Sequence, residues 1–318
     1  MEKYVILQIE GGIGKNVIAT AVVRAIEKKF KKERKIVIVT AYPDIWELNP
    51  RVHKVLQFGQ ITHFYEEFIQ DKETLVMIQD PYRDNDYIFR QKHLAQIWCD
   101  MYNIEWDGEK PELYFTQLEN DFVQSLINKD KPIFLINAFG GAQNQTHKYS
   151  WARDIPPVLA QEIVDEANKY YRVIQVRRED QIALKNCEYL SLSIRQLALT
   201  LIQSDKRLLI DSYLQHAAAS LNLPSVVLWA CNSPRVFGYK IHTNISAKLQ
   251  PASLKNSMYE PFDILGDPLQ LATHPGSLYN KVDVLKVLNF DTTLPRLDLI
   301  VPEINEKQFE QAWKKNTF

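Results

Sequence analysis

The sequence has little cysteine and no long apolar segment. Its three cysteines, Cys99, Cys187 and Cys231, lie far apart and form no Cys-x-x-Cys pair, which argues against a disulfide framework or a zinc site. The seven histidines lack metal-binding spacing, so we expect no metal and no cofactor. No apolar run approaches the roughly 20 residues that span a bilayer, and Met1 leads directly into a predicted strand. We therefore expect a cytoplasmic protein without a transmembrane segment.

An excess of charge of one sign is also missing. The 318 residues carry a net charge of −1, which excludes a global attraction to nucleic acid. One local exception is EKKFKKERK at 27–35, where six basic residues follow the first predicted helix. We interpret 28–35 as a solvated helix end that complements the helix dipole, with contact to a membrane surface or a polyanion as the alternative.

Short apolar strands alternate with helices in two successive series. The first series runs from YVILQI at 4–9 to a helix around 89–104, and the second from PIFLINAFGG at 132–141 to SVVLWAC at 225–231. This alternation is typical of parallel strands joined by crossover helices, so the fold class is α/β with two Rossmann-like domains facing a central cleft. From about 240 the pattern thins and predicts loops. We place the domains at 1–120 and 121–300, followed by a C-terminal helix at 301–318 that could pack back on the first domain.

A glycine-rich turn joins the first strand to the first helix. It does not match a P-loop, because Asn16 stands where a Ser or Thr is required. It does not match a dinucleotide fingerprint either, because Val17 stands in the place of the third glycine. Gly12 and Gly14 still allow close approach of a ligand to the backbone, and the exposed N–H groups of the helix start attract an anion or a polar group. The turn predicts a binding site, with a turn selected only for packing as the alternative.

The densest polar pattern is LLIDSYLQHAAASLNLPSVVLWACNSP at 208–234. A strand ends at Asp211 and Ser212, and His216 lies near the first turn of the helix that follows. The next strand ends at Asn232. Because parallel strands end at the same edge of a sheet, these residues predict a second binding site. The alternative is a simple helix cap beside a packed histidine.

This segment resembles the second domain of glycosyltransferase family 9, the ADP-heptose:lipopolysaccharide heptosyltransferases. The family motif Asp-Ser/Thr-Gly-x-x-His matches Asp211, Ser212 and His216, with Tyr213 in place of the glycine. The family sequence AAALGKPVV is followed in register by AAASLNLPSVV, and the family loop FGPTxP falls on the residues from Asn232 onward.

Further motifs of the same family match in the same order along the chain. GDVVLTTPLIRAL lies without gaps over GKNVIATAVVRAI at 14–26, and NPxVDxV lies over NPRVHKV at 49–55. Lys-x-Trp-Pro resembles KYSW at 148–151 with one insertion, and SLxELAALL resembles SIRQLALTLI at 193–202. The resemblance covers most of residues 5–235 and implies the GT-B fold.

The resemblance also implies an activity. A GT-B enzyme of this kind moves a sugar from a nucleotide-sugar donor to an acceptor hydroxyl with inversion and without a metal, using one general base and groups that stabilise the departing diphosphate. The acceptor could be a saccharide, a lipid-linked saccharide such as lipopolysaccharide, or a modified DNA base. We expect donor-side contacts from the strand ends and helix starts of the second domain, at Lys148, Arg177, Glu179, Asp211, Ser212, Tyr213, His216 and Asn232. A surface turn is the alternative for Arg177 and Glu179.

The main departure from the family is at the general base. The family aspartate proposed as the base is replaced by Lys15, between the acceptor-side residues Gly14 and Asn16. Glu10 and Asp80 each follow a predicted strand and could act as the base, and we place Glu10 slightly ahead. Alternatively, Lys15 could hold an anionic acceptor, or the protein could bind a nucleotide sugar or saccharide without catalysis.

Two other resemblances are shorter. Asp84-Asn85-Asp86 resembles the Asp-x-Asp metal motif of the other large glycosyltransferase fold, but three residues in a polar turn match easily by chance. GGIGKN at 11–16 resembles the GGLGNQ turn of fucosyltransferases. The long match around Asp211 favours family 9 over both.

Overall fold

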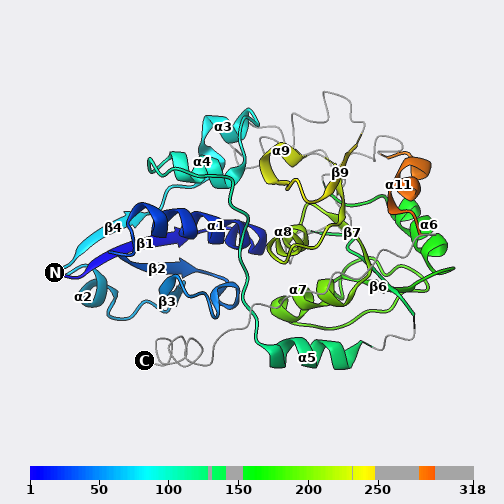
Figure 1. The fold of residues 1–318 in the computed structure, drawn as a ribbon, viewed down its shortest axis with the longest axis horizontal. Coiled ribbons are helices and arrows are strands. Elements are labelled where there is room, and N and C mark those ends of the chain that lie inside the picture. The colour runs from blue at the N-terminus through cyan, green and yellow to red at the C-terminus, as the bar shows by residue number, and fades with distance from the viewer. Residues whose placement is uncertain (128–130, 141–152, 231, 248–278, 291–318) are drawn as a thin grey trace.

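Two parallel β-sheets, one in each half of the chain, form the framework of the protein (Figure 1). The structure is a computed structural model, and it describes residues 1–127, 131–140, 153–230, 232–247 and 279–290. The first sheet has the order β3-β2-β1-β4 and the second β6-β5-β7-β8-β9, and all neighbouring strands are parallel. The predicted α/β fold with two Rossmann-like domains is confirmed.

The strands are short and mostly buried, as their apolar β-branched residues predict. In the first sheet they are β1 (Lys3–Ile9), β2 (Lys35–Thr40), β3 (Val52–Gln57) and β4 (Glu73–Met77). In the second sheet they are β5 (Ile133–Ile136), β6 (Arg172–Gln175), β7 (Lys206–Ile210), β8 (Val226–Trp229) and β9 (Thr243–Ser246).

The first sheet is covered chiefly by α1 (Ile13–Lys29) and α4 (Leu94–Asp100), which contact each other. Buried apolar residues such as Val17, Val22 and Ile26 fix the inner face of α1. The shorter elements of this half are α2 (Phe64–Phe68), α3 (Asn85–Ile88) and the 3-10 turns η1 (Pro43–Trp46) and η2 (Pro81–Arg83).

The single helix predicted around 89–104 is wrong in its extent. Arg90 has a positive φ of 54°, which ends α3. His93 has an extended backbone and accepts the N–H of Ala95 at its Nδ1, 3.2 Å away, so that it caps the start of α4. A left-handed residue and a cap therefore delay the start of the predicted helix to Leu94, and the helix ends at Asp100.

The helices of the second half are α5 (Gln117–Leu126), α6 (Pro157–Ala167), α7 (Ile194–Gln203), α8 (Tyr213–Ser220), α9 (Pro234–Phe237) and α11 (Lys281–Leu288). Ser193 and Gln196 form a reciprocal capping box at the start of α7. The expectation of loops after residue 240 is corrected by β9 and α11. The predicted helix at 301–318 lies outside the described residues.

The two halves are held together by Arg195, which projects from α7 and is only 8% exposed. Its guanidinium pairs with Glu119 at 2.7 Å and with Glu47 of the first domain at 3.1 Å. It also donates to the carbonyl oxygens of Asp44 at 3.1 Å and Tyr114 at 2.8 Å. One buried cation thus joins η1, the connecting segment, α5 and α7.

Part of the basic run at 28–35 is engaged within the protein. Lys28 pairs with Asp107, Arg34 with Glu73 and Lys35 with Glu2, while Lys29 donates to backbone carbonyl oxygens of the 102–103 turn.

In the described part of the chain, no helix combines the length and apolar character needed to cross a membrane.

Candidate active site

The glycine turn of the first domain contacts the start of α8 in the second domain. A Cβ atom placed on Gly14 would lie 3.2 Å from Cδ2 of His216 and 3.6 Å from Cα of Tyr213. Figure 1 shows α1 and α8 meeting between the two sheets. The two motifs singled out in the sequence, about 200 residues apart, therefore lie on either side of one interface, where the carboxyl ends of β1 and β7 face each other.

Lys15 lies beside Asp80 at this interface. The side chain of Lys15 is 3% exposed, and its Nζ lies 2.8 Å from Oδ1 of Asp80. The same Nζ lies 4.7 Å from the ring centroid of Tyr82 and 5.3 Å from that of Trp98. A cation in this position is stabilised by both the carboxylate and the aromatic faces.

Among the described residues, both hydrogen bonds to the Asp80 carboxylate are made to the same oxygen. Oδ1 accepts from Lys15 and from the N–H of Tyr82, 3.0 Å away. Among the described residues, Oδ2 has no hydrogen-bond partner. The side chain is 25% exposed, so a carboxylate oxygen with accepting capacity stands at the end of β4.

Glu10 occupies a different environment, although it also follows a strand. It is exposed at the end of β1, and its Oε1 accepts a hydrogen bond from Gln8 at 3.0 Å. Among the described residues it forms no ion pair with Lys15. Of the two carboxylates proposed as bases, Asp80 is the one that the fold brings to Lys15.

Asn16 is fully buried, and its side chain holds the glycine turn in place by hydrogen bonds. Its Oδ1 accepts hydrogen bonds from Thr40 Oγ1 at 2.5 Å and from Trp46 Nε1 at 3.1 Å. Its Nδ2 donates to the carbonyl oxygen of Gly12 at 3.2 Å. Asn16 therefore fixes the position of Gly12 and links it to the end of β2. A Cβ atom on Gly12 would meet nothing within 4 Å, so the backbone there is open to a ligand.

The predicted polar residues at the ends of β7 and β8 are close together. Asn232 donates a hydrogen bond from its side-chain amide to Oδ2 of Asp211, and Ser212 donates to Oδ1 of Asn137 at 2.6 Å. Burial raises the pKa of the Asp211 carboxyl, against the opposing effects of the Arg153 guanidinium and the Asn232 hydrogen bond. Arg153 was not anticipated from the sequence and places positive charge at this edge.

His216 belongs to a group of three histidines around Tyr239, of which His216 and His242 are buried and His93 is half-buried. Its Nδ1 lies 2.9 Å from the Tyr239 hydroxyl, and the rings of His93 and His242 lie 5.4 and 6.0 Å from the Tyr239 ring. Burial lowers the pKa of His93 and of His242 to about 4. Burial, with smaller contributions from His93 and His242, lowers the pKa of His216 well below its usual value. These histidines are neutral at pH 7 and fill the domain interface.

This cluster predicts a stability that falls in acid. Below about pH 6.5 an unfolded histidine binds a proton that the buried histidine does not, so unfolding is favoured as the pH falls toward 4. Each such histidine contributes a slope of about 1.4 kcal/mol per pH unit. We expect His93→Phe to reduce the slope measured by urea denaturation between pH 6.5 and 4.5. Substitution of the exposed His63 by Asn is the control, and an equal slope in all three proteins would contradict the prediction.

Tyr213 and Arg177 have intramolecular partners of their own. The hydroxyl of Tyr213 donates to the carbonyl oxygen of Ile194 at 2.9 Å, which joins α8 to α7. The Arg177 guanidinium lies 4.3 Å from the Tyr189 ring centroid and donates to the Arg178 and Glu179 carbonyl oxygens.

Arg177 and the exposed Glu179 thus form a turn at the end of β6. Among the described residues, neither makes a hydrogen bond to Asp211. Lys148, predicted to contact the donor phosphates, lies outside the described residues.

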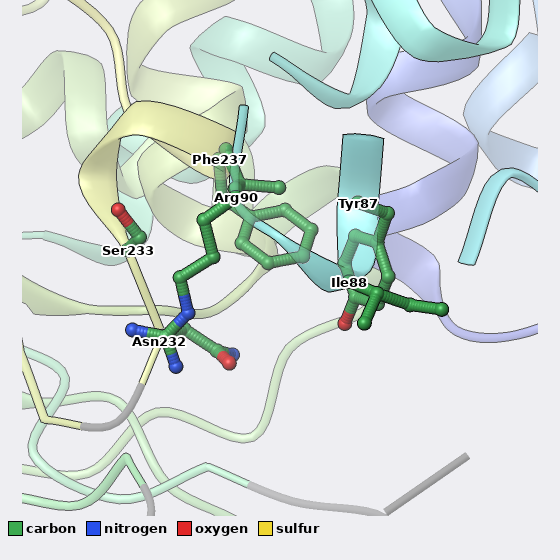
Figure 2. A pocket seen from close by; sticks show the side chains of 7 residues that line it. Tyr87, Ile88, Arg90, Asn232, Ser233 and Phe237 are labelled. Atoms are coloured by element: carbon green, nitrogen blue, oxygen red, sulfur yellow. The ribbon is translucent and has the colours of Figure 1, made fainter. Parts of the chain in front are cut away.

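A pocket opens between the two domains next to this interface (Figure 2). It is small, with a cavity volume of about 10 Å³, which is room for about one water molecule. The first domain contributes Tyr87, Ile88 and Arg90, and the second contributes the loop after β8 and α9, with Asn232, Ser233, Val236 and Phe237. Asn232 links the pocket to Asp211.

Solved structures of glycosyltransferases superpose on this chain. A glycosyl transferase family 9 structure from Veillonella parvula superposes with a TM-score of 0.63 at 12% identity, over 92% of this chain and 98% of that one. E. coli ADP-heptose LPS heptosyltransferase II superposes with a TM-score of 0.56 at 14% identity, over 78% of this chain and 91% of that one. E. coli heptosyltransferase WaaC with ADP superposes with a TM-score of 0.55 at 11% identity, over 91% of this chain and 100% of that one.

The chain has the GT-B fold. No family model and no curated protein matches the sequence. The resemblance to family 9 heptosyltransferases inferred from short motifs is confirmed at the level of the GT-B fold, at identities too low to carry residue roles across. Within the described residues of this GT-B chain, no group of three or more His, Cys, Asp or Glu side chains could hold a metal ion.

Proposed function

We propose that the protein is a glycosyltransferase that moves a sugar from a nucleotide-sugar donor to an acceptor hydroxyl, with inversion and without a metal. The observation that carries the proposal is the position of Asp80. Its carboxylate is held by Lys15 at the carboxyl edge of the first sheet, beside the glycine turn that contacts α8. The shared GT-B fold and the ADP complex named for WaaC support a nucleotide-sugar donor.

We assign the donor to the second domain. The backbone N–H groups at the start of α8 follow Asp211 and Ser212, and such groups favour the charge of a diphosphate. The Asp211 carboxylate accepts a hydrogen bond from Asn232, and it is suited to accept further hydrogen bonds from the hydroxyl groups of a ribose or sugar. Lys148, by resemblance to the family, would contact the phosphates.

We assign the role of general base to Asp80. The acceptor oxygen attacks the anomeric carbon from the side opposite the diphosphate, and Oδ2 of Asp80 takes the proton of that hydroxyl. The bond from the anomeric carbon to the diphosphate oxygen breaks, and the diphosphate leaves with the electron pair. Lys15 acts as a positioning residue, because its hydrogen bond to Oδ1 fixes the carboxylate and leaves Oδ2 able to take the proton.

We place the acceptor against the first domain, where Gly12 leaves the backbone open. A saccharide or a lipid-linked saccharide is the proposed acceptor class, with a modified DNA base as the alternative. If binding occurs without turnover, the second candidate is a nucleotide-sugar or saccharide binding protein. The replacement of the family aspartate by Lys15 favours that candidate.

Calorimetric titration with ADP-, GDP-, UDP- and CMP-sugars tests the proposal. We expect one nucleotide class to bind, and to bind about tenfold more weakly to Asp211→Asn, which corresponds to roughly 1.4 kcal/mol. Asp165→Asn, which changes an exposed carboxylate of the same domain, is the matched control. Equal affinity for wild type and Asp211→Asn would place the donor elsewhere.

A further inference from the structure

The outer edge of β4 presents backbone hydrogen-bonding groups to solvent. β4 is the last strand of the first sheet, and it pairs with β1 on one side only (Figure 1). The N–H of Glu73 bonds to the carbonyl oxygen of Glu2 at 3.0 Å, so the backbone groups of Glu73 point inward. Because these groups alternate in direction along a strand, those of Thr74 and Val76 point outward. Among the described residues, the outward N–H groups have no backbone partner.

The side chains at this edge are apolar and exposed on both faces of the sheet. Leu75 is 39% exposed, Val76 is 50% exposed, and Ile78, directly after the strand, is 58% exposed. Val76 stands beside the buried Ile6 in the register with β1, and Leu75 stands beside the buried Val5. Successive side chains point to opposite faces of a sheet. Each face of the first sheet therefore extends its apolar surface to the β4 edge.

β4 lacks the features that usually shield an edge strand. The residues TLVMIQ at 74–79 include no charge and no proline, and the register of β4 with β1 is continuous. Charged side chains, prolines and bulges are the common protections of such edges. The opposite edge of the same sheet, β3, carries Lys54, and the edge strand β9 of the second sheet has the polar sequence TNIS. Compared with these edges, β4 is suited to pairing with another strand.

We propose that β4 pairs with β4 of a second copy of this chain, in antiparallel orientation about a two-fold axis at Val76. In this register Val76 lies opposite its own counterpart, and Thr74 lies opposite Ile78. The outward backbone groups of Val76 exchange hydrogen bonds with those of the counterpart. The two first-domain sheets then form one continuous sheet, which removes the exposed edge from both copies.

A second copy is the partner that this edge fits best, because the edge is complementary to itself. A two-fold interface uses the same patch on both copies. In the register centred on Val76, Leu75 lies opposite Met77, so apolar side chains meet on the face of the main core. Glu73 lies opposite the neutral Gln79, so no like charges face each other along the strand. This inference does not depend on the proposed function.

Sedimentation of the full chain in the analytical ultracentrifuge, at concentrations up to about 100 μM, tests the proposal. We expect the wild-type protein to form a dimer. Val76→Lys and Val76→Glu each place like charges opposite each other across the axis, and each should weaken dimerisation at least about tenfold. Val158→Lys is the matched control, because it changes a 74% exposed valine on α6 and should leave dimerisation unchanged.

An equimolar mixture of Val76→Lys and Val76→Glu tests the register. Position 76 faces itself only if the two-fold axis passes through it, and the mixture then brings opposite charges together. We expect the mixture to dimerise more strongly than either variant alone. Because the mixture contains the same two proteins, a difference in their folding stability does not produce this recovery.

Three results would overturn the proposal. The first is a wild-type protein that remains monomeric over the whole concentration range. The second is dimerisation that is unchanged in both Val76 variants, which would assign the dimer to another surface. The third is a mixture that dimerises no better than its separate components, which would refute a two-fold axis at Val76.

Discussion

Asp80→Asn is expected to lower kcat by about 10²–10⁴-fold, the usual contribution of a positioned general base. The amide keeps an oxygen that can accept the N–H of Tyr82, so the local turn is retained. It cannot take a proton from the acceptor hydroxyl. The measurement is the steady-state rate of nucleotide release with the donor and acceptor identified by binding.

Glu10→Gln is the matched control for Asp80→Asn. Glu10 also follows a strand, but it is exposed, and its described hydrogen bond is to Gln8 rather than to Lys15. Its kcat should equal that of wild type. Donor affinity should be unchanged in both variants, which separates loss of the base from loss of the fold. A normal rate for Asp80→Asn together with a reduced rate for Glu10→Gln would reverse the assignment.

Arg195→Met is expected to lower the free energy of unfolding by roughly 2 kcal/mol, because it removes a buried guanidinium that donates to two carboxylates and two carbonyl oxygens, all of them partly exposed. Glu119 and Glu47 lose their ion pairs, and the carbonyl oxygens of Asp44 and Tyr114 lose hydrogen bonds. Methionine keeps the apolar stem, so the loss reports on the charged group. Urea denaturation at pH 7 measures the change.

Lys28→Met is the control for this second variant. Lys28 pairs with Asp107 on the surface, with 62% of its side chain exposed, and exposed pairs of this kind contribute little to stability. We expect its denaturation curve to overlie that of wild type. If Arg195→Met behaved in the same way, Arg195 would not be the residue that joins the domains.

The regular part of the fold was predictable because its signals are local. β1, the glycine turn and α1 follow from apolar runs and glycine spacing between residues 3 and 29. β9 was missed because Thr243–Ser246 is largely exposed and has no apolar alternation. The start of α4 at Leu94 was missed because the left-handed Arg90 before it carries no compositional mark.

The candidate site was predictable only in part, since its contacts join distant segments. Asp80 could be placed at a strand end, but its pairing with Lys15 spans 65 residues and depends on β4 lying beside β1. The histidine cluster combines His93, His216 and His242 from three elements. No local pattern marks such a cluster, because each histidine by itself is compatible with a surface position.

The central claim is that a nucleotide sugar binds between the two domains without a metal. Titration of the four nucleotide-sugar classes into the wild-type protein, with and without a metal chelator, tests it most directly. We predict that one class binds with the same affinity in both conditions. Binding of none of the four classes, or binding that the chelator abolishes, would contradict it.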